Sequence, residues 1–65
     1  MNLLEKIDIL MLGTEIKKKL KQKKITNLKQ LTNLKRKDLS RLEFNQYEIE
    51  QIEIKLQLEG LDLKR

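Results

Sequence analysis

The stretch that decides the fold of this chain is residues 46–60, QYEIEQIEIKLQLEG. Its apolar residues Ile49, Ile52 and Leu56 recur every three or four positions, which is the spacing of one face of an α-helix. Gly60 follows them and can adopt the left-handed conformation in which many helices end. The stretch therefore predicts a final helix from about residue 46 to residue 59.

A second pattern in the same stretch is that of a β-strand. Apolar and polar residues alternate strictly, the apolar ones being Ile52, Ile54, Leu56 and Leu58. Such alternation is typical of a strand with one buried face. No other segment alternates as cleanly, so a strand here would have no partner, and we prefer the helix. Asn45 precedes it as a turn residue, because asparagine tolerates the left-handed conformation of a tight turn.

Further helices are predicted upstream. Apolar residues four positions apart indicate a first helix over about residues 14–24, with Gly13-Thr14 as its cap. These apolar residues are Leu12, Ile16 and Leu20. The pairs Thr26-Asn27 and Thr32-Asn33 repeat one capping device, and each predicts a short helix. The inward residues are Leu28 and Leu31 in the first short helix, and Leu34, Leu39 and Leu42 in the second.

Together these elements predict the fold class. The chain has 65 residues, no proline and two glycines, so only local turn chemistry interrupts its helices. We expect residues 1–65 to form a single all-α domain, a compact four- to five-helix bundle. Leu61 and Leu63, which follow the final helix, are expected to fold back over the core.

Composition excludes most classes of function. Cysteine and histidine are absent, which removes thiolate nucleophiles, imidazole bases and the usual zinc ligands. The remaining acid or base candidates are carboxylates expected on helix surfaces: Asp38, Glu43, Glu48, Glu50 and Glu53. We therefore expect no enzyme activity, no cofactor and no metal. No apolar run approaches the roughly 20 residues of a membrane span and no signal peptide is recognisable, so we expect a cytoplasmic protein without membrane contact.

Charge divides the chain into a basic and an acidic part. Residues 17–37 hold ten lysines and arginines and no acid, whereas residues 43–59 hold five glutamates and one lysine. The net charge is +5, which favours nucleic acid, an acidic protein or a membrane surface as partner, but charge alone does not choose among them. One surface of the folded chain would thus attract polyanions and another would repel them.

Residue spacings over nearly the whole chain match one family. The matching segments are Ile7, Leu10 and Leu12, then Leu20 and Ile25, then ITNLKQL at residues 25–31, then Asp38-Leu39, and finally Ile49, Ile52 and Leu56 with Gly60-Leu61-Asp62-Leu63. In these the chain resembles the C-terminal domain of the bacterial RNA polymerase α subunit. The resemblance implies a bundle with helix-hairpin-helix elements and a link to DNA or transcription.

At the positions of that family's DNA contacts the residues differ. The resemblance puts Glu15 in the place of the arginine that enters the minor groove, and Lys18 in the place of an asparagine. The family's phosphate-gripping hairpin corresponds to residues 45–48, NQYE. Its Glu48 suits a helix N-terminus but occupies the place of a phosphate. We therefore do not expect the family's own minor-groove recognition, and any DNA binding must be of another kind.

The basic run supports contact with phosphates that is independent of base sequence. Lysines act on phosphates as point charges, and no side chain here offers the forks that read base edges. The predicted nucleic-acid-binding residues are Lys17, Lys18, Lys21 and Lys24, supported by Lys35, Arg36 and Lys37. The alternative is that the run only keeps a small protein solvated.

A second predicted surface lies on the final helix. Tyr47, Ile54 and Leu58 fall opposite its inward stripe, and a helix that is apolar on two faces has a second surface to bury. One possibility is that the N-terminal segment covers it, because four apolar residues there lack partners: Leu3, Leu4, Ile9 and Met11. The other is a protein interface, either a homodimer or a docking surface for RNA polymerase or another transcription protein. The chain would then have kept the fold and lost the family's DNA contacts.

Overall fold

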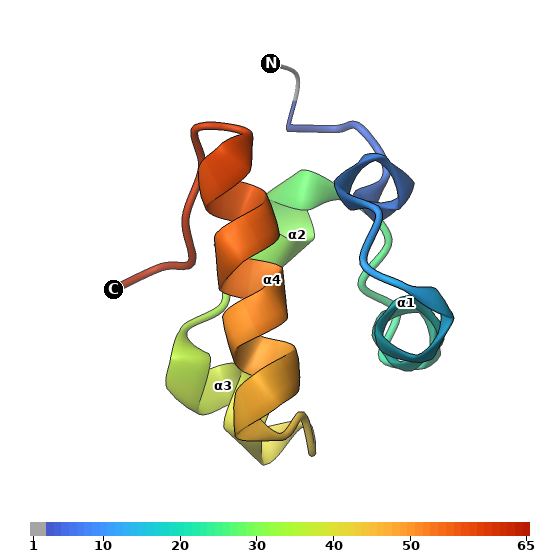
Figure 1. Cartoon of the computed structure of the whole chain (residues 1–65), viewed down its shortest axis with the longest axis vertical. Coiled ribbons are helices and arrows are strands. Elements are labelled where there is room, and N and C mark those ends of the chain that lie inside the picture. Colours follow the sequence, from blue (N-terminus) through green and yellow to red (C-terminus); the bar gives the residue numbers. More distant parts are fainter. Residues whose placement is uncertain (1–2) are drawn as a thin grey trace.

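The computed structural model describes residues 3–65, which form four α-helices and one 3₁₀ helix (Figure 1). The elements are η1 at Ile7–Leu10, α1 at Thr14–Gln22, α2 at Leu28–Thr32, α3 at Arg36–Arg41 and α4 at Gln46–Leu58. Within the described residues no strand forms, and an isolated bridge joins Lys6 to Asn27. The predicted all-α bundle is confirmed, whereas its helix-hairpin-helix elements stay a prediction.

The C-terminal stretch is one continuous helix, so the strand alternative is wrong. Ile49, Ile52 and Leu56 are all buried, as the helical spacing predicts. The alternating pattern fails because a period of 3.6 residues turns Ile52 and Leu56 inward and leaves Ile54 on the outside. Helical periodicity therefore accounts for the buried stripe, and the alternation is incidental.

Asn45 has a different role from the one predicted. Its backbone is extended (φ −79°) rather than left-handed, and its side chain accepts a hydrogen bond from the Glu48 N–H at 2.8 Å. Glu48 returns the bond by accepting the Asn45 N–H at 2.9 Å. This reciprocal pair is a capping box, which satisfies amides that the helix itself cannot. The left-handed residue of this turn is Glu43 (φ 73°).

The first short helix begins as predicted. The side chain of Asn27 accepts the Gln30 N–H at 2.8 Å, so Asn27 caps α2. The N-terminal segment lies against the same helix end: the Leu28 N–H donates to the Glu5 carbonyl at 2.9 Å and the Lys29 N–H to the Leu3 carbonyl at 2.7 Å. The Asn27 side chain and the N-terminal segment together satisfy three amides at the start of a helix that has only five residues.

The second short helix begins later than predicted, so the Thr32-Asn33 cap is wrong. Thr32 is the last residue of α2, and α3 starts only after Lys35. The Lys35 N–H donates to the Asp38 carboxylate at 2.9 Å, which makes Asp38 the side chain that closes this helix end. Leu34 consequently lies in the link between the two helices and is only partly buried.

Three helices end in the same motif. In each, one residue turns left-handed and the next, which is apolar, donates its N–H to a carbonyl five residues earlier, an arrangement known as the Schellman motif. The bonds run from Ile25 to Leu20 at 2.9 Å, from Phe44 to Leu39 at 3.1 Å and from Leu61 to Leu56 at 2.8 Å. The left-handed residues are Lys24 (φ 63°), Glu43 (φ 73°) and Gly60 (φ 75°). Of these three residues the sequence predicted only Gly60. Because Lys24 adopts the left-handed conformation, α1 ends at Gln22 rather than near residue 24.

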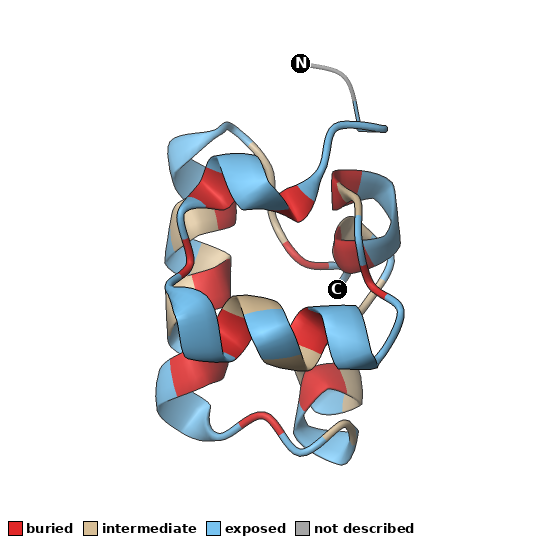
Figure 2. Cartoon of the chain, turned by 90° about the vertical axis from the view of Figure 1, so that its right-hand side faces the viewer, coloured by how far each residue is buried: buried red, intermediate tan, exposed pale blue. Residues whose placement is uncertain are grey.

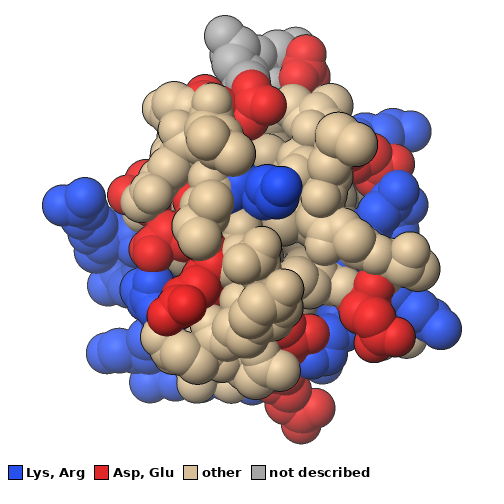
Figure 3. All heavy atoms as spheres, in the orientation of Figure 1, with Lys and Arg blue, Asp and Glu red and all other residues tan. Residues whose placement is uncertain are grey.

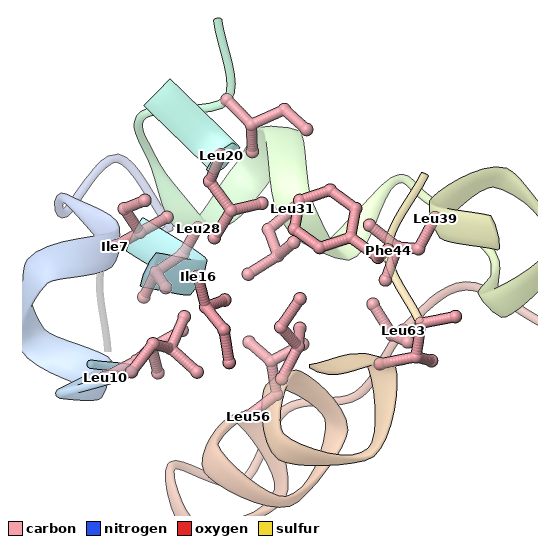
Figure 4. Packing of buried hydrophobic residues seen from close by; sticks show 14 residues of the cluster. Ile7, Leu10, Ile16, Leu20, Leu28, Leu31, Leu39, Phe44, Leu56 and Leu63 are labelled. Atoms are coloured by element: carbon pink, nitrogen blue, oxygen red, sulfur yellow. The ribbon is translucent and has the colours of Figure 1, made fainter. Parts of the chain in front are cut away.

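One hydrophobic core joins all five elements. Figure 2 shows that each helix turns its buried side to the interior, and Figure 4 shows side chains from η1, α1, α2 and α4 converging there. The buried residues are Ile7, Leu10, Leu12, Ile16, Leu20, Ile25, Leu28, Leu31, Leu39, Phe44, Ile49, Ile52, Leu56 and Leu63. Leu61 packs against this cluster, so the predicted return of the C-terminal residues is confirmed. Among residues 3–65 no helix has the length and apolar character needed to cross a membrane.

Candidate nucleic-acid interface

The inward stripe of α1 determines which of its lysines reach solvent together. Ile16 and Leu20 are buried, so the opposite side of the helix carries Lys17, Lys18 and Lys21. All three line one surface hollow at the start of α1. The other residues around this hollow are Asp8, Met11, Leu12, Gly13 and Thr14. Three of the seven predicted phosphate-binding residues are therefore brought together; the hollow and these three lysines are called the α1 basic surface below.

Among the described residues, Asp8 is the only acid that lines the α1 basic surface. Its carboxylate lies 3.5 Å from the Lys17 ammonium and 3.8 Å from that of Lys21. The three side chains are 40–50% exposed, and ion pairs this exposed contribute between about 0 and 1 kcal/mol. Lys18 makes no ion pair with any residue in the range 3–65. The three ammonium groups are thus available to an external anion at little energetic cost.

Lys24 lies apart from this group. It is the left-handed residue that ends α1, it is exposed, and its backbone turns the chain toward α2. It is not one of the residues that line the hollow. Lys24 therefore extends the basic region beyond the helix end, and it has a structural role that the sequence did not reveal.

Lys19 is the lysine of α1 that faces the rest of the molecule. Its ammonium donates to the Glu48 carboxylate at 2.7 Å and to the Glu43 carbonyl at 3.1 Å, and lies 5.2 Å from the centre of the Phe44 ring. Glu48 is buried, with 8% of its surface exposed. Lys19 thus ties α1 to the capping box of α4, and sequence reasoning missed this role. The spacing of Asn45 and Glu48 was the available signal for the capping box.

The surroundings of Glu48 favour its charged form. The hydrogen bond from Lys19 lowers the pKa of this carboxyl most, the Asn45 N–H lowers it further, and burial acts in the opposite direction. The net effect is a pKa below the ordinary value of 4.5. At neutral pH Glu48 is therefore ionised, and the ammonium of Lys19 balances its charge.

The remaining predicted bases, Lys35, Arg36 and Lys37, form a second cluster. They lie at the start of α3, which Figure 1 places on the opposite side of α4 from α1. Arg36 makes an ion pair with Glu53 of α4. The cluster lines its own hollow together with Lys64 and Arg65 of the C-terminal segment, whose Lys64 N–H donates to the Leu34 carbonyl at 2.9 Å. The seven predicted residues thus occupy two separate surfaces and do not form one face.

The predicted interface residues of α4 are exposed. Tyr47 has 67% of its surface exposed, Ile54 47% and Leu58 75%. The alternative in which the N-terminal segment covers Ile54 or Leu58 is therefore wrong. Exposed apolar residues also occur in that segment itself: Leu3, Leu4, Ile9 and Met11.

The described residues contain no group of three or more carboxylates that could hold a metal ion. Comparison of the chain with protein-family models, with curated proteins and with solved structures found no match. The resemblance to the RNA polymerase domain therefore stays a prediction from sequence.

Proposed function

We propose that this chain is a small non-enzymatic binding module that contacts nucleic-acid phosphates through the α1 basic surface, independently of base sequence. The observation that carries the proposal is the grouping of Lys17, Lys18 and Lys21 around one hollow. The phosphates of a nucleic-acid duplex are spaced closely enough for neighbouring lysines on one face of an α-helix to reach several of them. The link to transcription rests on the sequence resemblance alone.

The chemistry of the surface argues for phosphates rather than bases. A lysine ammonium is a compact point charge that tolerates many phosphate geometries. Stacking on bases would need exposed aromatic rings. Phe44 is buried beside Lys19, and Tyr47 stands on the separate helix α4. A surface with these residues favours affinity without strong sequence preference.

The internal pairing of charges supports the same proposal. Glu48 is the one buried acid among residues 3–65, and Lys19 neutralises it. Asp8 pairs with two exposed lysines and can be outcompeted by a phosphate. The α1 basic surface consequently keeps a net positive charge, while the acids of residues 43–59 belong mainly to α4 and the turns around it.

The proposal is tested by titrating a labelled duplex of mixed sequence with the chain at two or more salt concentrations. Binding should weaken steeply as salt rises, with a log-log slope of about 0.9 per phosphate neutralised. The triple variant Lys17→Gln, Lys18→Gln, Lys21→Gln should lower that slope by about 2 to 3. Unrelated duplexes should bind within a few-fold of one another.

A matched control separates the α1 basic surface from net charge. The variant Lys35→Gln, Lys37→Gln, Lys64→Gln also removes three positive charges, but from the second cluster. It should change the slope less than the α1 variant does. Equal effects of the two variants would mean that net charge alone attracts the duplex, and no binding at low salt would refute the proposal.

A further inference from the structure

The outward face of α4 has the pattern of a coiled-coil seam. Tyr47, Gln51, Ile54 and Leu58 are separated by four, three and four positions, which is the spacing of residues that interlock between two helices. They lie opposite the buried stripe of Ile49, Ile52 and Leu56. In Figure 2 α4 stands at the left edge of the molecule, with its exposed side turned outward. A helix from another molecule could therefore reach the whole seam.

We propose that a second copy of this chain covers the seam, with the two α4 helices parallel and related by a two-fold axis. Tyr47, Ile54 and Leu58 would each pack against the same residue of the partner. The other side of α4 is already packed on its own core, which leaves one stripe of the helix for the contact, as a pair of helices requires. The proposal does not depend on nucleic-acid binding.

Two charges flanking the seam identify the partner and its direction. Glu50 and Lys55 lie on opposite sides of the seam, five positions apart. In a parallel pair of helices, residues with this relation face each other across the interface. Glu50 would meet the partner's Lys55, and symmetry would repeat the contact. In an antiparallel pair, Glu50 would instead meet the partner's Glu50, which is unfavourable.

Neither charge is used within the described part of the molecule. Among residues 3–65 no ion pair involves Glu50 or Lys55; Glu50 accepts a 3.4 Å hydrogen bond from Gln46. Figure 3 looks onto the face that α4 covers: uncharged side chains surround one basic group near the centre, and acidic groups lie to the left of it. The face is thus complementary to a parallel copy of itself.

The interface is short, so we expect weak association. It uses one face of a 13-residue helix, which places it at the small end of specific protein interfaces. Sedimentation equilibrium should give a dissociation constant between about 1 μM and 1 mM. The variant Ile54→Gln, Leu58→Gln should weaken association at least ~10-fold. A chain that stays monomeric at about 1 mM, or a variant that associates as the parent does, would overturn the proposal.

Charge reversal tests the direction. Glu50→Lys and Lys55→Glu should each weaken association by ~10-fold, because each replaces attraction by repulsion at two symmetry-related contacts. The double variant Glu50→Lys, Lys55→Glu should restore it. Failure to restore, with all variants folded by circular dichroism, would overturn the parallel arrangement.

A covalent link provides an independent measurement. The chain lacks cysteine, so the single variant Gln51→Cys would introduce one thiol in the seam. Under oxidation it should form a disulfide-linked dimer, because a parallel pair brings the two residues 51 face to face within bonding reach. The control Ser40→Cys on exposed α3 should dimerise much more slowly. Equal rates for the two variants would count against the seam.

Discussion

Replacing Lys19 by methionine should destabilise the fold far more than replacing any other lysine of α1. Methionine keeps most of the hydrocarbon stem and removes the ammonium, which bonds to the Glu48 carboxylate at 2.7 Å and to the Glu43 carbonyl at 3.1 Å. A hydrogen bond to a charged group contributes about 1.5–3 kcal/mol, and the contact with the Phe44 ring about 0.5–1 kcal/mol. The Lys19 side chain is 34% exposed, which reduces these values.

We therefore expect Lys19→Met to lower the free energy of unfolding by about 2 kcal/mol, and the melting temperature of a domain this small by about 10–15 °C. Urea denaturation followed by circular dichroism measures the first quantity. The control is Lys18→Met, which lies on the exposed side of the same helix and should change stability by less than about 0.5 kcal/mol. Both variants lose one positive charge, so their difference isolates the contacts of Lys19.

A double-mutant cycle with Glu48→Gln isolates the pair itself. Glutamine can still accept the Asn45 N–H, so the cap is kept while the charge is lost. We expect a coupling energy of about 1 kcal/mol between Lys19 and Glu48. A coupling below about 0.3 kcal/mol would refute the reasoning, because it would mean that the ammonium and the carboxylate act independently.

The pH dependence follows from the same pair. The folded pKa of Glu48 lies below its unfolded value, so its contribution to stability is fully present above the ordinary pKa of 4.5 and is lost as pH falls through the folded pKa. The parent should thus lose stability on acidification below about pH 5. Lys19→Met should lose less over that range, since the largest cause of the lowered pKa is gone.

Three further substitutions test the ends of the helices. Lys24→Gly should raise the free energy of unfolding by about 0.5–1 kcal/mol in urea denaturation, because glycine adopts the left-handed conformation without a side-chain penalty; no gain would contradict this. Gly13→Ala should lower the free energy of unfolding by about 1–3 kcal/mol, and with it the melting temperature, because a backbone with φ 82° and ψ 155° is adopted almost only by glycine. The cost would come from the backbone alone, since no atom lies within 4 Å of the added carbon. Asn45→Ala should cost about 1 kcal/mol in urea denaturation by freeing the Glu48 N–H, and a neutral result would show that water replaces the cap.

The apolar spacing of the sequence predicted most of the fold. Every apolar residue at the predicted inward positions of α1, α2 and α4 is buried, because a helical period needs only local sequence to be recognised. The helix boundaries were predicted less well. Lys24 and Glu43 end helices in a conformation usually given to glycine, and no rule based on residue type identifies them.

The candidate site could be predicted only in part. The predicted stripe of Ile16 and Leu20 already places Lys18 on the outer side of α1 and Lys19 beside the stripe. The partners of Lys19 could not be predicted, because they depend on how α1 packs against the start of α4. The separation of the second basic cluster from α1 depends on how α3 and α4 pack, which is a property of the tertiary structure. The exposed apolar residues of α4 were predictable because they lie on the side of the helix opposite the stripe of Ile49, Ile52 and Leu56, which the helical spacing identifies.

The contact of the N-terminal segment with α2 has a consequence for amide hydrogen exchange. The first amides of a helix normally exchange with solvent most quickly, because they have no partner within the helix. Here the amides of Leu28 and Lys29 are held by the carbonyls of Glu5 and Leu3. They should exchange slowly, and at similar rates, since detachment of the segment releases both. The exchange rates of the Leu28 and Lys29 amides would thus report how often the N-terminal segment detaches from α2.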